Sequence, residues 1–531
     1  MTPPASAFKK APRKEEPPLT AVVMLDVHDQ RFASILQSYP CFGTFPIANV
    51  PVINFALSGL MRTEVKNVFL VVSGLNSEYA DKIQKEWKMA FEEFNVVICD
   101  GAASLGDCMR ELHNRELITT DFLLLSSPTC LISTNLVTQI AEFRKRRRES
   151  ADNVMTLLYS HRENPEQSVI GVNSTTNKLM LFPAANSLNS VKAEKRDFYE
   201  GVDIRRDITN TGIAFCSRLI ATQFSDNFDF VSLDDVVREI LSKDDILGMS
   251  VHIDVMPTKE RAFYAYDFES LVLLNTLVLE RWFYPLVPET ADLSRCFTTN
   301  PRNLYREEDV ENIIIKAKTW ILSDLSSTVS FGRNAKISYE AVINNSSIGE
   351  NSTIESNTNI SNCLIGRNCR IGANCTIENS FIGDNVTIPD GAHIQKESVI
   401  GNGVIYPKGL TAVPHSAIFH DAINEDQFDK ISSQKIGSVH VAKLRSNAPF
   451  WKRSVNGRTN FSVEESESEG SDDEDDEDDN YGNGVDNSTR QFHDEVLESM
   501  QKILDSEDQP NQQFSEISEN APIDLKQWEI I

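Results

Sequence analysis

The chain has 531 residues, a formal net charge of −27 and 40% hydrophobic residues. A chain of this length rarely folds around one hydrophobic core, so we expect two or three domains. It contains no apolar stretch approaching the roughly 18 residues that a membrane-spanning helix needs, so no membrane association is predicted.

The first 18 residues are rich in proline and charge and contain no apolar signal core. We therefore predict a disordered tail over residues 1–18 and a cytosolic or nuclear protein, with the cytosol favoured. The nine cysteines are then expected to be reduced thiols.

Residues 19–300 alternate short aliphatic segments with amphipathic segments, which is typical of βαβ units and a mainly parallel sheet with helices on both faces. The expected strands are Leu19–Leu25, Val68–Ser73, Phe94–Cys99, Phe122–Leu125, Val154–Tyr159 and Val169–Asn173. The expected helices are Asn54–Thr63, Ser77–Phe91 and Leu105–Leu117. The basic run Arg144–Arg148 is interpreted as a solvated helix end, with a nuclear signal as the lesser alternative. Trp282 and Tyr284 are expected to pack at a domain junction.

Residues 301–423 are predicted to form a parallel β-helix, because a large aliphatic residue recurs every six, sometimes five, residues. A small residue stands two positions before each aliphatic one, and Gly349, Gly366, Gly383 and Gly401 are expected to supply left-handed corners. Cys363, Cys369 and Cys375 fall in the small column, which explains them without a metal. The interior column includes Ile348, Ile354, Ile360, Ile365, Ile371, Ile377, Ile382 and Ile388.

Residues 424–490 are predicted to be a disordered acidic linker. Glu464–Asp479 contains twelve acidic residues and no basic one, which argues against direct nucleic-acid binding. Ser466 and Ser471 each have a glutamate three residues further on and are candidate sites for an acidophilic kinase. Within residues 491–531, apolar residues from Phe492 to Leu504 predict one amphipathic helix.

A β-helix of hexapeptides resembles the left-handed parallel β-helix that follows sugar-nucleotidyltransferase domains, and Phe45–Ile53 resembles the segment of that family that contains an Asn-x-Pro motif and opens the next helix. The catalytic pattern is missing, however. The loop around Asp26, Asp29 and Arg31 has no glycines, Cys41 stands where the family's lysine belongs, and Ser126–Thr129 replaces the metal-binding aspartate. We therefore predict a pseudoenzyme domain with no catalytic residue for nucleotidyl transfer, no metal and no cofactor.

The combination of these domains resembles the epsilon subunit family of eukaryotic translation initiation factor 2B. The local similarities include Ser104–Asp107, Asp226–Asp229, Asp234–Arg238, Arg281–Glu289 and Phe492–Leu497, which is similar to the start of the family's C-terminal HEAT-type domain.

The resemblance implies a subunit of a guanine nucleotide exchange factor that promotes GDP/GTP exchange on translation initiation factor 2 without covalent chemistry. Its expected partners are the alpha, beta, gamma and delta subunits, gamma being the closest, and initiation factor 2 with GDP or GTP. Asn227 and Phe228 match a motif that the family links to contact with the G protein. Packing of Phe228 in the core, between Phe224 and Phe230, is the structural alternative.

The family's main exchange activity resides in the HEAT-type domain, of which this sequence contains about one helix. We therefore expect a chain that assembles but has weakened exchange activity. Two alternatives stay open: an active sugar-phosphate nucleotidyltransferase and a purely structural or regulatory subunit.

Overall fold

The computed structural model describes residues 19–25, 32, 38–72, 77–161, 169–182, 190–194, 201–291, 297–300, 303–306, 314–315, 329–410, 414–420, 434–436, 439–443 and 460–464. The predicted tail, the acidic run with Ser466 and Ser471, and the predicted C-terminal helix lie outside these residues. Within them, no helix is both long and apolar enough to cross a membrane.

The first domain is built on a seven-stranded mixed sheet in the order β14-β8-β13-β6-β1-β4-β5. Its strands are β1 (Leu19–Met24), β4 (Val65–Val72), β5 (Glu93–Ile98), β6 (Phe122–Leu125), β8 (Asn153–His161), β13 (Ile208–Cys216) and β14 (Ser250–Val255). Strands β6, β1, β4 and β5 are parallel, whereas β13 runs antiparallel to both β6 and β8. The central strands β1 and β6 are almost completely buried, as expected for a sheet covered on both faces.

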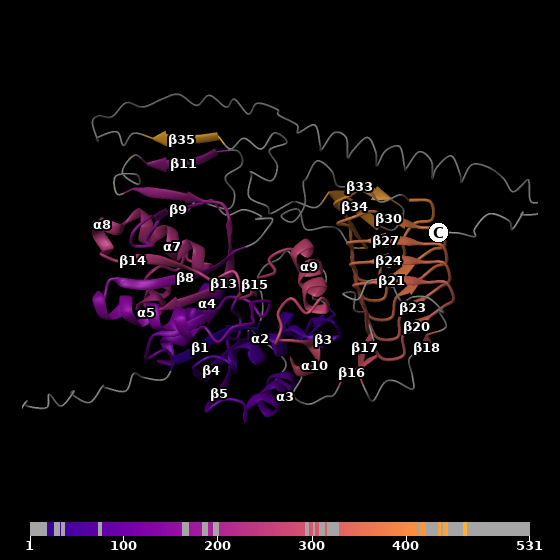
Figure 1. The fold of residues 1–531 in the computed structure, drawn as a ribbon, viewed down its shortest axis with the longest axis horizontal. Helices are drawn as coiled ribbons and strands as arrows, with labels where there is room; N and C mark the ends of the chain where they lie inside the picture. Colours follow the sequence, from indigo (N-terminus) through magenta and orange to yellow (C-terminus); the bar gives the residue numbers. More distant parts are fainter. Residues whose placement is uncertain are drawn as a thin grey trace, which may run out of the picture.

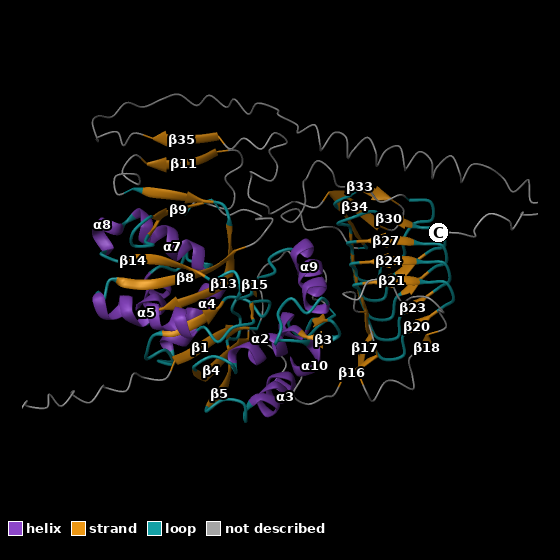
Figure 2. Cartoon of the chain, in the orientation of Figure 1, coloured by secondary structure: helices purple, strands orange, loops and turns teal. Residues whose placement is uncertain are grey.

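Helices cover both faces of this sheet (Figures 1 and 2). They are α2 (Val52–Leu60), α3 (Ser77–Trp87), α4 (Leu105–Asn114), α5 (Val137–Glu149), α6 (Leu219–Asp226) and α7 (Leu233–Ser242), with the short α8 (Asp244–Leu247). Shorter elements are η2 (Phe42–Thr44), β2 (Pro46–Ile47), β3 (Val50–Pro51), β7 (Leu131–Ile132), β9 (Ile170–Asn173), β10 (Leu179–Leu181), β12 (Val202–Arg205) and β15 (Ala262–Phe263). All the strands and helices expected within residues 19–300 are present, with ends shifted by at most four residues.

The second domain is a parallel β-helix whose coils advance by 17 residues. Its strands run from β19 (Val329–Phe331) to β31 (Val399–Ile400), and those from β19 to β28 (Phe381–Ile382) each pair in parallel with the strand one coil further on. On one of the three faces, Ile354, Ile371 and Ile388 stack in register. The inward-pointing residues of all three faces form a continuous buried core. The predicted succession of an α/β domain and a parallel β-helix is confirmed. The β-helix sheet extends beyond the predicted end at residue 423, because β34 (Val439–Lys443) pairs with β32 (Ser416–Phe419) and with β33 (Gln434–Ile436) inside the predicted linker.

The corners of the β-helix differ from the prediction. Gly349, Gly366 and Gly383 have no left-handed φ; the left-handed positions belong to asparagines such as Asn351 (φ 58°) and Asn368 (φ 57°). Asparagine adopts this conformation more readily than most residues, and the side-chain amide of Asn351 donates to that of Asn368 at 3.1 Å. The glycines are needed for space instead, because a Cβ at Gly349 would lie 2.4 Å from the carbonyl oxygen of Gly366 in the next coil.

The column of small residues also forms a ladder of hydrogen bonds between neighbouring coils. Cys369 is buried, its Sγ donates to the carbonyl oxygen of Gly383 at 3.0 Å, and its N–H donates to Ser352 Oγ at 3.0 Å. Burial raises the pKa of Cys369 to about 12, so the thiol stays protonated. Cys363 and Cys375 make equivalent bonds and are free thiols. Their hydrogen-bonding role accounts for serine, threonine and cysteine at these positions.

Helix α9 (Phe268–Leu279) joins the two domains (Figure 1). It is apolar nearly all round because it is covered on two sides, by the first domain and by one face of the β-helix. On that face Leu364, Phe381 and Val399 point outward and are buried in the same cluster as Phe268 and Leu271. The short α10 (Pro288–Ala291) follows and contacts α2.

Candidate functional site

Asn227 and Phe228 lie on an exposed loop after α6. Asn227 ends the helix, and its Oδ1 accepts the N–H of Asp229 at 3.0 Å, which closes a tight turn. Phe228 is 77% exposed, whereas Phe224 and Phe230 are buried and pack edge to face at 6.4 Å. The alternative that Phe228 belongs to the core is wrong.

Arg110, on α4, holds this loop in place. Its Nη1 donates to the carbonyl oxygens of Phe224 (3.1 Å) and Phe230 (3.3 Å), and its Nη2 pairs with Asp107 at 2.6 Å. The guanidinium carbon lies 5.5 Å from the ring centre of Phe228. The Arg110 side chain is only 12% exposed, so the cation contacts the protein-facing side of the Phe228 ring, and the rest of the ring is open to solvent.

Two copies of one short pattern build the loop from both sides: Ser-Leu-Gly-Asp-Cys-Met-Arg (104–110) and Ser-Leu-Asp-Asp-Val-Val-Arg (232–238). In the second, Asp235 accepts from Ser232 N (2.8 Å) and Ser232 Oγ (2.8 Å), and Arg238 pairs with it at 2.7 Å. Partial burial tends to raise the pKa of Asp235, but these bonds outweigh it and hold the pKa below its usual value. Sequence reasoning noted both segments but not their common spacing, which is a signal for two equivalent N-terminal caps.

The predicted nucleotidyltransferase edge is only partly described. Asp26, Asp29 and Arg31 lie outside the described residues. Cys41 is buried in the core. Three residues, Ser126, Ser127 and Thr129, follow β6 directly.

The hydroxyls of these three residues are used internally. Ser126 Oγ donates to the carbonyl oxygen of Gly212 at 2.9 Å, and Thr129 Oγ1 to that of Ala265 at 3.0 Å. Ser127 Oγ lies 2.9 Å from Thr129 Oγ1, and both residues are fully buried. These side chains stabilise the turn, and none of them is a carboxylate that could hold magnesium.

The basic run at the end of α5 is largely neutralised by the fold. Arg144 pairs with Glu64 at 3.0 Å, and Arg147 pairs with Asp121 at 3.0 Å. Arg147 also donates to the carbonyl oxygen of Ala151 at 2.6 Å, next to the end of the helix. The run therefore acts as a structural helix end.

Trp282 and Tyr284 were both predicted to pack at the domain junction, and the structure confirms this only for Trp282. Its ring lies 4.8 Å from that of Phe283 and 4.5 Å from the guanidinium of Arg261. Tyr284 is 74% exposed, so that part of the prediction is wrong.

The contacts between the two domains were not foreseen from the sequence. The turn between β2 and β3, with left-handed Ala48 and Asn49, reaches the first coils of the β-helix. Asn49 Nδ2 donates to Ser330 Oγ (2.7 Å) and to the carbonyl oxygen of Ile348 (3.1 Å). Asn275 Oδ1 accepts from Ala48 N (3.0 Å) and from Ser347 Oγ (2.6 Å).

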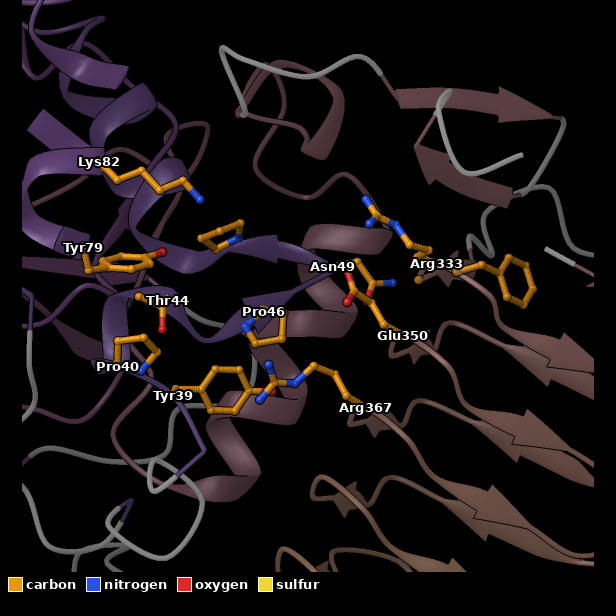
Figure 3. A pocket seen from close by; sticks show the side chains of 13 residues that line it. Tyr39, Pro40, Thr44, Pro46, Asn49, Tyr79, Lys82, Arg333, Glu350 and Arg367 are labelled. Carbon is orange, nitrogen blue, oxygen red and sulfur yellow. The ribbon is translucent and has the colours of Figure 1, made fainter. Parts of the chain in front are cut away.

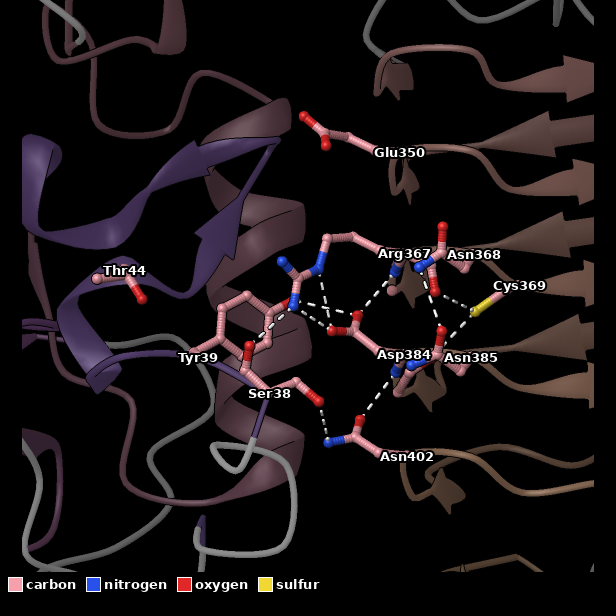
Figure 4. A network of polar contacts seen from close by, with 12 residues as sticks. Ser38, Tyr39, Thr44, Glu350, Arg367, Asn368, Cys369, Asp384, Asn385 and Asn402 are labelled. Carbon is pink, nitrogen blue, oxygen red and sulfur yellow. Dashed lines mark hydrogen bonds and ion pairs between the residues drawn. The ribbon is translucent and has the colours of Figure 1, made fainter.

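A second contact centres on Asp384, whose side chain is 3% exposed (Figure 4). Its carboxylate accepts from Arg367 Nη2 (2.6 Å), Nε (3.0 Å) and backbone N (2.7 Å) and from Tyr39 Oη (3.2 Å). The Arg367 guanidinium lies 4.3 Å from the ring centre of Tyr39 and donates to the carbonyl oxygen of Ser38 at 3.0 Å. Burial and the Asp384 carboxylate raise the pKa of Tyr39, which keeps its hydroxyl protonated as a donor.

A cavity of about 350 Å³ lies beside this contact, where the first domain meets the corners of the β-helix (Figure 3). Cations and aromatic rings from both domains line it. Its lining residues are Tyr39, Pro40, Thr44, Pro46, Asn49, Pro51, Tyr79, Lys82, Phe331, Gly332, Arg333, Glu350 and Arg367.

One cluster of the described residues has a composition that could bind a metal ion. The ligand atoms of Glu269, Glu397 and His415 lie within 4.8 Å of one another, and His415 Nε2 is 2.8 Å from Glu397. The direct contact between His415 and Glu397 already explains their proximity as an ion pair or hydrogen bond.

Residues 302–425 match the family model described as the LbH domain of the eIF2B subunit epsilon. The chain is 29% identical over 340 residues to the translation initiation factor eIF2B subunit epsilon of Schizosaccharomyces pombe, which covers 60% of this chain and 49% of that protein. It is 25% identical over 311 residues to the protein of the same name from Dictyostelium discoideum, with 56% and 43% covered. The chain thus spans about half the length of these curated relatives.

Proposed function

We propose that this chain, a homologue of the epsilon subunit of translation initiation factor eIF2B, is a subunit of the eIF2B complex and takes part in GDP/GTP exchange on translation initiation factor 2. The similarity to epsilon subunits over 60% of the chain is the observation that carries this proposal. The proposed location is the cytoplasm.

The two domains would serve assembly with the other subunits of the complex, the gamma subunit first among them. They are joined by a shared apolar cluster around α9 and by the polar contacts of Asn49, Asn275 and Asp384. A rigid pair of domains presents a large preformed surface, which lowers the entropic cost of association.

The loop of Asn227 and Phe228 is the proposed contact with initiation factor 2. Exchange requires that the factor binds the nucleotide-free G protein more tightly than the GDP form, and no bond is made or broken. An exposed aromatic ring fixed over a buried arginine suits such a contact, because little side-chain entropy is lost on binding.

Nucleotidyl transfer is not proposed, because the described end of β6 presents internally bonded hydroxyls instead of a metal-binding carboxylate. A pyrophosphate-release assay with sugar phosphates and nucleoside triphosphates should therefore give no signal above background.

Co-expression with a gamma-type subunit tests the assembly role. Residues 19–443, which keep strands β33 and β34 of the β-helix sheet, should co-purify with the partner as well as the full chain does, since residues 444–531 contain the acidic run, whose charge favours solvation over packing. Failure of both chains to form the complex would contradict the proposal. Complex formation by the full chain alone would move the contact to residues 444–531.

A further inference from the structure

The cavity at the domain junction has the composition of a ligand site. Its volume of about 350 Å³ is within the range of small-molecule pockets, roughly 300–1,000 Å³. Three prolines, Phe331 and the ring of Tyr79 supply apolar walls. Its polar lining includes three cationic side chains and one carboxylate, that of Glu350.

Arg367 is a preorganised cation at this cavity (Figures 3 and 4). Its Nε and Nη2 are fixed by Asp384 and by the carbonyl oxygen of Ser38. Nη1 has no hydrogen-bond partner among the described residues, and no dashed line reaches it in Figure 4. The N–H bonds of Nη1 therefore remain available at a fixed position for a charge-assisted hydrogen bond to a phosphate oxygen.

Lys82 supplies a second cation from the other domain, on α3. Its Nζ lies 5.8 Å from the ring centre of Tyr79, and it forms no ion pair with a carboxylate in the described part of the chain. In Figure 3, Lys82 and Tyr79 lie on the side of the first domain, and Arg333 and Glu350 on the side of the β-helix. Because Asp384 already compensates Arg367, the remaining lining still carries one more positive than negative charge.

We propose that this cavity binds a small phosphate monoester with a cyclic body, namely a sugar phosphate or a nucleoside monophosphate. Arg367 and Lys82 would hold the phosphate, and the proline and tyrosine walls would contact the ring. Because the lining comes from both domains, the bound molecule would favour their docked arrangement. The proposal is independent of the exchange activity, because it concerns neither Asn227 nor Phe228.

Isothermal titration calorimetry and thermal unfolding of the full chain test this site with glucose 6-phosphate, AMP and inorganic phosphate, and with glucose and adenosine as uncharged controls. We expect saturable binding and a rise in melting temperature with at least one ester. The uncharged compounds should give neither. Tighter binding of AMP assigns a nucleotide and tighter binding of glucose 6-phosphate a sugar phosphate; both support the proposal.

Lys82→Ala should weaken ester binding at least about tenfold, as expected for losing a hydrogen bond to a charged group, without lowering the melting temperature of the free protein. Lys85→Ala is the matched control, since Lys85 is exposed on the same helix but does not line the cavity. Arg367→Lys, which keeps the charge and loses the planar donors, should also weaken binding. The proposal is overturned if no ester binds at millimolar concentration, if inorganic phosphate binds as tightly as the esters, or if Lys82→Ala and Lys85→Ala behave alike.

Discussion

Replacing Asp384 by asparagine should remove the ion pair that fixes Arg367 at the domain junction, together with one hydrogen bond from Tyr39 of the first domain. The carboxylate accepts three hydrogen bonds from Arg367 and one from Tyr39, and its side chain is only 3% exposed. Asparagine keeps one acceptor oxygen and turns an NH₂ group toward the donors of Arg367. Breaking a buried ion pair costs about 3–5 kcal/mol, and since Arg367 is 35% exposed we expect about 2–3 kcal/mol.

Urea unfolding followed by circular dichroism measures this cost as a lower midpoint of the first transition. Glu355→Gln is the matched control, because Glu355 pairs with Arg370 in the same β-helix at 4.0 Å with both side chains exposed to solvent. That change should cost less than about 0.5 kcal/mol. Equal costs for the two variants would refute the role of Asp384 as the buried anchor of Arg367 at the domain junction.

Three further outcomes are expected. Ile371→Asp places an unpaired carboxylate at a 1% exposed position between two coils, so it should lower the free energy of unfolding by several kcal/mol and detach partner subunits before the first domain unfolds. Ile405→Asp, at a 65% exposed position, should have neither effect. Burial lowers the pKa of His252 to about 4 from an ordinary 6.5, so the unfolded state binds the proton at a higher pH than the folded state. The free energy of unfolding should therefore fall by about 1.4 kcal/mol per pH unit between about pH 6.5 and pH 4, and His252→Gln should flatten this slope. Mass spectrometry of the cellular protein should find phosphate on Ser466 and Ser471, and unmodified serines under all growth conditions would contradict the kinase prediction.

The β-helix could be predicted because its period is visible in one column of residues. The sequence also contains a signal for the packing of the β-helix against α9. The pairs Leu364-Ile365, Phe381-Ile382 and Val399-Ile400 place an apolar residue on the outer surface once per coil. On the solvent-exposed face the corresponding outer residue is polar, as where Arg370 precedes Ile371. The reason for the corner glycines could not be predicted, since it depends on the distance between neighbouring coils and not on local φ.

The first domain shows where local patterns fail. Strand β13 (Ile208–Cys216) was not predicted, because its polar half and left-handed Gly212 interrupt the apolar pattern at a bulge. The sequence also could not separate exposed Phe228 from buried Phe224 and Phe230, which share one short segment.

The contacts at the domain junction could not be predicted from the sequence for a different reason. Tyr39 and Asp384 are separated by 345 residues, and nothing local to either residue indicates the other. Such contacts follow from the docking of two complete domains, which only the three-dimensional structure provides.

The central claim is that this chain serves nucleotide exchange through the loop of Asn227 and Phe228. The direct measurement is the rate of GDP release from initiation factor 2 by the complex assembled with this chain. The double change Asn227→Ala, Phe228→Ala should leave assembly intact and change stability little, since Phe228 is 77% exposed and Asn227 loses one exposed hydrogen bond, from Asp229 N. It should lower the rate about tenfold or more, as for an interface hot spot. Met89→Ala, at a 92% exposed apolar position elsewhere on the domain, should leave the rate unchanged. Equal rates for the parent and the double variant would contradict the claim.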